Sequence, residues 1–167
     1  ANIIKSKRGD LFIETAKEIS KTYENAKFYI VGSDKKKILK KNKFHNKKNN
    51  ITYMGYAPNN KIWFNKCNLL LVTSENEGFN RTIVEGMLSQ IPVLTVDSGA
   101  HKEIIKNNFN GWITKNKNPK VLSDMCIRIL ELNQAKLSKV LNRAKNFAKR
   151  NYSAKRQVNK LSKIYLD

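Results

Sequence analysis

The segment from Glu77 to Gly111 holds the side chains whose types and spacing could do chemistry. Glu77 precedes a Gly-Phe-Asn turn, and Glu85 follows inside a predicted helix. Backbone N–H groups at a helix start attract phosphate, and carboxylates accept hydrogen bonds from sugar hydroxyls. The pattern therefore suits a phosphorylated, hydroxyl-rich ligand.

The chain resembles the retaining glycosyltransferases of family four, in the lobe that binds the nucleotide sugar. From Glu77 to Val93 it reads EGFNRTIVEGMLSQIPV, where the family shows E-G-F-G-x-x-x-x-E-A-M-A-x-G-x-P-V. Further matches, in the family's order, are Arg8-Gly9, Ile30-Val31-Gly32, Tyr53-Met54-Gly55, Asp97-Ser98-Gly99 and Asn110-Gly111. Such an ordered set is a stronger sign than two spaced glutamates. The resemblance implies the C-terminal lobe of a GT-B fold enzyme.

The resemblance also implies roles for the two glutamates and the turn between them. Glu77 would lie beside the transferred sugar, as an electrostatic stabiliser or as a nucleophile. The backbone amides of Gly78 and Phe79 would hold sugar hydroxyls. Glu85 would bind the two ribose hydroxyls, although an acid early in a helix can also serve only the helix dipole.

The leaving diphosphate and the base have candidate partners elsewhere in the chain. Arg8, with Lys7 as a substitute, stands where the family's lysine meets the diphosphate, and a fixed cation there replaces a metal. Met54 is either near the base or part of the core. Asn80 replaces a family glycine; it is a good helix cap and tolerates a left-handed backbone. It would leave the amides of Arg81, Thr82 and Ile83 to face a pyrophosphate.

Short apolar runs alternate with amphipathic stretches, which predicts an α/β fold with a Rossmann-like, doubly wound parallel sheet. Ligands bind beyond the carboxyl ends of such strands, so the motif segments should meet at one edge. The expected strands are Asn2–Ile4, Lys27–Val31, Ile51–Tyr53, Leu69–Thr73, Val93–Val96 and Gly111–Ile113. The expected helices are Gly9–Tyr23, Lys35–Lys41, Lys61–Asn65, Thr82–Ser89, Lys102–Lys106, Val121–Leu132, Ala135–Arg150 and Ala154–Leu166.

We expect residues 1–167 to form one nucleotide-sugar-binding lobe, with the N-terminal acceptor lobe absent. Cys67 and Cys126 are too scattered to indicate a disulfide, which favours a reducing cytoplasm. His45 and His101 lack metal-ligand spacing and are interpreted as surface residues, so no cofactor and no metal is expected. The larger aromatics are assigned to packing: Tyr23, Phe28, Trp63, Phe64, Trp112 and Phe147.

The formal charge of +20 has two interpretations. It could attract a phosphate-rich partner, either the nucleotide sugar or an anionic membrane at the inner face. Alternatively, AT-rich codons account for the 27 Lys, 22 Asn and 16 Ile without any binding role. Nucleic acid is not favoured, because the basic runs lack interleaved aromatics.

Three functions remain in view. A glycosyltransferase lobe that serves a glycolipid or surface polysaccharide acceptor, with retention, fits the motif best. A sugar-nucleotide epimerase of related architecture would lack the complete glutamate block. A non-catalytic nucleotide-binding or membrane-docking module would not need both glutamates.

Overall fold

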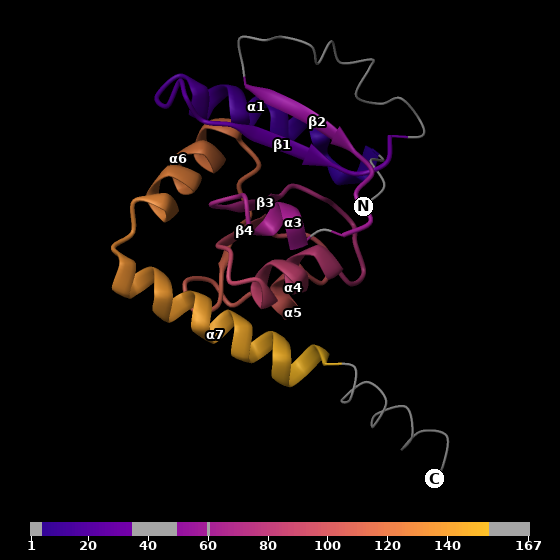
Figure 1. Cartoon of the computed structure of the whole chain (residues 1–167), viewed down its shortest axis with the longest axis vertical. Coiled ribbons are helices and arrows are strands. Elements are labelled where there is room, and N and C mark those ends of the chain that lie inside the picture. Colours follow the sequence, from indigo (N-terminus) through magenta and orange to yellow (C-terminus); the bar gives the residue numbers. More distant parts are fainter. Residues whose placement is uncertain (1–4, 35–49, 60, 154–167) are drawn as a thin grey trace.

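Helices and parallel strands alternate along the chain in the computed structural model, which describes residues 5–34, 50–59 and 61–153 (Figure 1). The strands are β1 Phe28–Val31, β2 Ile51–Gly55, β3 Leu70–Val72, β4 Val93–Val96 and β5 Trp112–Thr114. The helices are η1 Lys5–Lys7, α1 Gly9–Ser20, α3 Lys61–Phe64, α4 Arg81–Leu88, α5 His101–Ile104, α6 Pro119–Leu130 and α7 Gln134–Tyr152. The predicted α/β class is confirmed.

All pairings between these strands are parallel, but they form two sheets where one was expected. One sheet has the order β1-β2, and the other has the order β3-β4-β5. Three predicted elements lie outside the described residues: strand Asn2–Ile4 and helices Lys35–Lys41 and Ala154–Leu166. The other predicted elements are present, with ends shifted by up to three residues.

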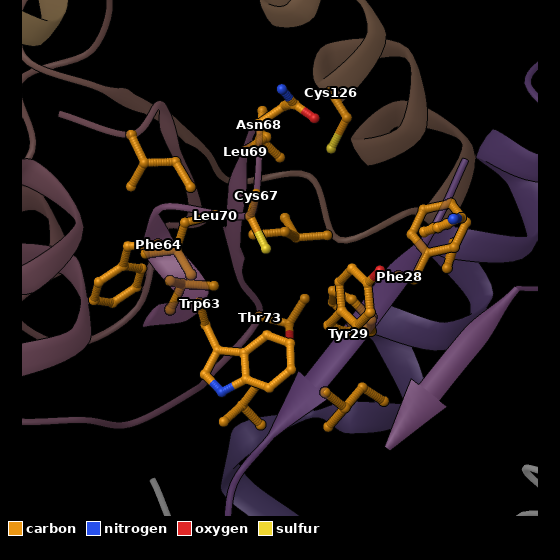
Figure 2. A pocket seen from close by; sticks show the side chains of 18 of the residues that line it. Phe28, Tyr29, Trp63, Phe64, Cys67, Asn68, Leu69, Leu70, Thr73 and Cys126 are labelled. Atoms are coloured by element: carbon orange, nitrogen blue, oxygen red, sulfur yellow. The ribbon is translucent and has the colours of Figure 1, made fainter. Parts of the chain in front are cut away.

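A cavity of about 580 Å³ separates the two sheets. Apolar side chains from β1 and β3 line it, and Figure 2 shows Tyr29 and Trp63 near one another at one side, with ring centroids 5.5 Å apart. Lys7, Ser74 and Asn80 also line the cavity. Most of the side chains that line the cavity are apolar.

The core is built around β4, whose four residues are all buried. One cluster joins β4 to α1 and α6 through Leu94, Leu11 and Leu122. A second cluster joins the other face to α4 and α7, through Ile83 and Ala144. In Figure 1, α7 crosses below α4 accordingly. A parallel strand covered on both faces is mainly apolar, as Val93–Val96 is apart from the buried Thr95.

Local sequence explains several helix ends. Asn118 caps α6 by accepting from the Lys120 amide at 2.9 Å, and Pro119 takes the first turn. After α4, Gln90 adopts a left-handed φ of 55° where a glycine is favoured. Its side chain bonds to Asn142 at 2.9 Å and to Lys145 at 2.6 Å, which ties this turn to α7.

The packing role predicted for the aromatics holds for most of them. Phe64 and Trp112 are buried, and Phe28, Trp63 and Phe147 are partly buried. Tyr23 departs from the prediction, because it is 43% exposed and donates a hydrogen bond to Glu131 at 2.6 Å. A tyrosine hydroxyl at the surface is satisfied this way without entering the core.

Candidate active site

The loop from Thr73 to Asn80 leaves β3 at its carboxyl end and meets η1 there. The Thr73 hydroxyl lies 3.0 Å from the carbonyl oxygens of both Lys7 and Arg8. The Glu75 amide donates to the carbonyl of Ser6 at 2.7 Å. These contacts join Arg8-Gly9 to the loop that carries Glu77. Both belong to the four motif segments expected at one sheet edge, of which the other two end at Gly32 and Gly55.

The other two segments are joined to each other. The Gly32 amide donates to the Gly55 carbonyl at 2.8 Å, and the Tyr53 hydroxyl donates to the Gly32 carbonyl at 2.8 Å. Met54, between them, is 39% exposed, so it is not core. An exposed thioether at a strand end remains available to contact a ligand.

Glu77 forms an ion pair with the ammonium group of Lys7. The Glu77 side chain is only 13% exposed, and that of Lys7 is 31% exposed. Burial lowers the pKa of the Lys7 ammonium from its ordinary value. A partly buried ion pair is stronger than one at the surface, because the surrounding dielectric constant is lower.

The backbone of Glu77 is held from the other side by the loop after β4. Its carbonyl accepts from the Ala100 amide at 3.2 Å. Gly99 packs directly against that carbonyl, with a left-handed φ of 54°, so any side chain there would overlap Glu77. The neighbouring Asn76 amide donates to the Ser98 hydroxyl at 2.7 Å. The position of Glu77 therefore depends on two separate chain segments.

Arg8 is held by carboxylates. It donates to Glu75 at 2.7 Å and to Asp10 at 3.0 Å, from a left-handed backbone with φ 48°. Lys117 also contacts Glu75, at 2.8 Å. These bonds, first that from Lys117 and then the charge of Arg8, lower the pKa of the Glu75 carboxyl. The diphosphate candidate is thus a preoriented guanidinium beside a second cation.

Gly78 and Phe79 form the exposed part of the turn. A Cβ built on Gly78 would meet no atom within 4 Å, so a ligand can approach this backbone closely. Phe79 is 52% exposed, and its ring packs edge-on against Tyr152 of α7 at 5.0 Å. The turn is therefore open above Gly78 and supported from the side at Phe79.

Asn80 caps α4 as predicted, accepting from the Thr82 amide at 3.2 Å. Two further expectations for this cap are wrong. The backbone of Asn80 is extended, with φ −92°, so tolerance of a left-handed backbone is not what selects asparagine. The Thr82 and Ile83 amides are not free as expected, because each donates to Asn80 at 3.2 Å. The role of these amides toward a pyrophosphate stays a prediction.

His101 is not a surface residue, contrary to the sequence-based expectation. It is fully buried, and its ring contacts Asn80, Thr95 and Val96. The expectation failed because His101 begins the short helix α5 directly beneath the Glu77 loop, which only the tertiary structure reveals.

Glu85 lies one turn into α4 and is partly exposed, with 34% of its side chain accessible. Arg81, on the same helix face, places a guanidinium nitrogen 3.9 Å from its carboxylate. Arg81 itself is 83% exposed, so this contact is weak. Glu85 therefore lies partly at the surface of α4, and its role toward ligand hydroxyls stays a prediction.

The structure thus brings Lys7, Arg8 and Glu77 together at the carboxyl edge of β3, followed in the chain by Asn80 and α4. Sequence reasoning missed Glu75 and Lys117. A second acid in Ser-Glu-Asn-Glu-Gly was the available signal for Glu75. Lys117 carries no such signal, because it reaches the site from the turn before α6.

The described part of the chain has neither a metal-binding cluster nor a membrane-spanning helix. Among residues 5–34, 50–59 and 61–153, no group of three or more His, Cys, Asp or Glu side chains could hold a metal ion. Within the same ranges, no helix is long and apolar enough to cross a bilayer. Cys67 and Cys126 are both free thiols.

The chain belongs to the glycosyl transferases group 1 family, whose model matches residues 1–153. The resemblance drawn from the glutamate motif is thereby confirmed.

Two relatives with assigned activities are similar in sequence. A poly(ribitol-phosphate) alpha-N-acetylglucosaminyltransferase of Staphylococcus aureus is 32% identical over 135 residues, which are 79% of this chain and 27% of that protein. A lipopolysaccharide core biosynthesis mannosyltransferase of Rhizobium leguminosarum is 36% identical over 63 residues, covering 38% of this chain and 18% of that protein.

Solved structures confirm the fold of a GT-B C-terminal lobe. Staphylococcus aureus TarM, in complex with UDP among other ligands, superposes with a TM-score of 0.86 at 26% identity over 100% of this chain and 34% of TarM. Anabaena HepE with UDP and glucose gives a TM-score of 0.87 at 17% identity, over 100% of this chain and 46% of HepE. This chain therefore spans only 27% of the Staphylococcus transferase and 34% of TarM.

Proposed function

We propose that this chain is the donor-binding lobe of a retaining glycosyltransferase, which transfers a sugar from a nucleotide diphosphate to a glycolipid or surface polysaccharide. The observation that carries the proposal is the Lys7–Glu77 ion pair beside the preoriented Arg8. It puts a carboxylate next to two cations at the edge where parallel-sheet proteins bind ligands. TarM and HepE, which have this fold, hold UDP in their solved complexes.

The role of each site residue follows from the charge that develops next to it during sugar transfer. The leaving diphosphate gains negative charge, which Arg8 and Lys7 stabilise as fixed cations. The anomeric carbon gains positive charge, which the Glu77 carboxylate stabilises or attacks. Glu85 accepts hydrogen bonds from the ribose, Met54 contacts the base, and the open backbone at Gly78 and Phe79 holds the sugar. No metal or other cofactor is required in this scheme.

In this proposal residues 1–167 supply only the donor side. An N-terminal lobe supplies the acceptor side, and the chain alone transfers no sugar. Family membership and the complete glutamate block favour transfer over the epimerase and the non-catalytic module.

Saturation-transfer NMR of the chain with UDP, GDP and ADP, each with and without a sugar, tests the proposal. We expect one base to be preferred and the sugar protons to receive saturation. Absence of saturation transfer for all of them would overturn the proposal. Transfer to the nucleotides with no contribution from any sugar would favour the non-catalytic module.

The basic surface of α7 supports a second proposal, that the protein binds peripherally at the inner face of the membrane. The helix carries six basic residues and no acidic one between Gln134 and Tyr152. Lys136, Lys139 and Lys149 are exposed on it. Each basic residue near an anionic bilayer contributes about 1 kcal/mol of binding.

Sedimentation with phosphatidylserine-rich vesicles, whose negative surface potential attracts basic segments, tests this property. We expect binding that is lost in a Lys136→Glu/Lys139→Glu variant and retained in the matched Lys27→Glu/Lys61→Glu control. Equal loss in both variants would assign the attraction to net charge alone.

A further inference from the structure

His101 is a fully buried titratable residue that the proposed chemistry does not use. Its Nδ1 atom lies 2.9 Å from the Val96 carbonyl oxygen and 2.9 Å from the Thr95 hydroxyl. Its Nε2 atom lies 3.1 Å from the amide nitrogen of Asn80. The imidazole therefore connects the core strand β4 to the residue that starts α4.

These contacts determine which ring nitrogen carries the proton. The Val96 carbonyl can only accept, so Nδ1 must donate. The Thr95 hydroxyl can accept as well, since it has its own acceptor in the Val72 carbonyl at 3.1 Å. Nε2 then keeps its lone pair and accepts from the Asn80 side chain. The network assigns the Nδ1–H tautomer.

The tautomer in turn determines which way the Asn80 amide points. Its nitrogen donates both to His101 and to the Ser74 hydroxyl, the latter at 3.0 Å. Its oxygen is left to accept from the Thr82 amide. With the amide reversed, an oxygen would face the Nε2 lone pair and the helix cap would be lost.

We propose that His101 is a positioning residue of the donor site, which as its Nδ1–H tautomer orients Asn80 and fixes the turn from Glu77 to Thr82. The consequence of this positioning for catalysis rests on the proposed function. The ring of His101 acts at one end of that turn, where it holds Asn80. The other end is held by the backbone next to His101, since the Ala100 amide donates to the Glu77 carbonyl.

Protonation of the ring would reverse this effect, because an imidazolium has no acceptor for Asn80. Two charged groups act on the ring: Lys7 of η1 and Asp97 at the end of β4. Burial lowers the pKa of His101, the bond to Val96 and the charge of Asp97 oppose this, and Lys7 adds to it. The neutral form needed for the Asn80 contact is thus favoured at neutral pH.

The first test reads the tautomer in the unaltered chain. ¹⁵N NMR of the imidazole at pH 7.5 should show a protonated Nδ1 and an unprotonated Nε2, with the signal assigned through a His101→Gln variant. The Nε2–H tautomer, or rapid exchange between the two forms, would overturn the inference without any reference to ligand binding.

The second test compares His101→Gln with His101→Asn. Gln places an acceptor near the Nε2 position, whereas the shorter Asn reaches only the Nδ1 position. Both lose the ring, so a purely structural role affects both equally. We expect hydrogen exchange of the Thr82 amide to stay slow in the Gln variant and to rise about tenfold in the Asn variant. UDP affinity should follow the same order.

Equal effects of Gln and Asn on Thr82 exchange would overturn the inference. If the wild-type chain binds no UDP, GDP or ADP while Thr82 exchange follows the predicted order, the proposed function fails and the positioning by His101 stands.

Discussion

The Lys7 ammonium and the Glu77 carboxylate form an ion pair across 70 residues of sequence, at the junction of η1 and the loop after β3. In the proposed site one partner serves the leaving diphosphate and the other serves the sugar. The pair therefore holds two catalytic groups of opposite charge in place before the donor arrives, which is a form of preorganisation.

Replacement of Glu77 by Gln should lower turnover by orders of magnitude in an enzyme that contains both lobes, because the carboxylate charge is lost and its shape is kept. Nucleotide affinity should stay nearly constant, since Glu77 faces the sugar. Steady-state kinetics and UDP titration measure the two effects. Normal turnover in this variant would leave Glu77 as a loop acid that only pairs with Lys7.

Replacement of Arg8 by Ala should weaken UDP binding by roughly tenfold and leave uridine binding almost unchanged, because the guanidinium acts on the diphosphate. Glu75→Gln is the matched control: it keeps Arg8 and removes the carboxylate that orients it. We expect a smaller loss there. Equal losses for UDP and uridine in Arg8→Ala would argue for a folding effect.

Replacement of Glu85 by Ala should weaken binding of nucleotides and of the free nucleoside alike, by roughly 1–3 kcal/mol, if its bonds to the ribose form. Arg81→Ala tests whether the effect comes from the ion pair on the same face, and it should leave nucleoside affinity unchanged. Calorimetric titration measures both. An inert Glu85→Ala variant would reduce Glu85 to a helix-dipole role.

Replacement of Gly78 by alanine and replacement of Gly99 by alanine should affect the stability of the fold to very different extents. Gly78→Ala meets open space, so stability should change by less than about 0.5 kcal/mol. The added methyl group should still weaken binding of the nucleotide sugar more than binding of the nucleotide. Gly99→Ala faces a left-handed backbone and the Glu77 carbonyl, and should cost about 1–3 kcal/mol of unfolding free energy. Urea unfolding separates the two, and similar stabilities would contradict the described packing.

Acid should destabilise the fold through His101. Its pKa is lowered from 6.5, chiefly by burial, so the unfolded chain binds a proton more readily than the folded one. Unfolding free energy should therefore be constant above that pH and fall as the pH drops below it toward the folded pKa. Urea unfolding from pH 8 to pH 5 tests this, and His101→Gln should lack that component of the pH dependence.

The sequence alone determined the class of fold and the family, and it predicted the principal site residues. Short apolar runs predicted the parallel strands, because a strand that is buried on both faces needs apolar side chains. The strand Val93–Val96 has the predicted bounds. Asn80 marked the start of α4 because capping is a local interaction. The glutamate motif identified the family because its residues lie within one continuous segment.

The tertiary structure alone decided which of those residues act on one another. His101 is buried and Tyr23 is exposed, although their types suggested the opposite. Lys117 joins Glu75 from a distant turn, and Lys7, rather than Arg8, pairs with Glu77. Burial and ion pairing depend on contacts between segments far apart in the chain, and short-range spacing carries no record of those contacts.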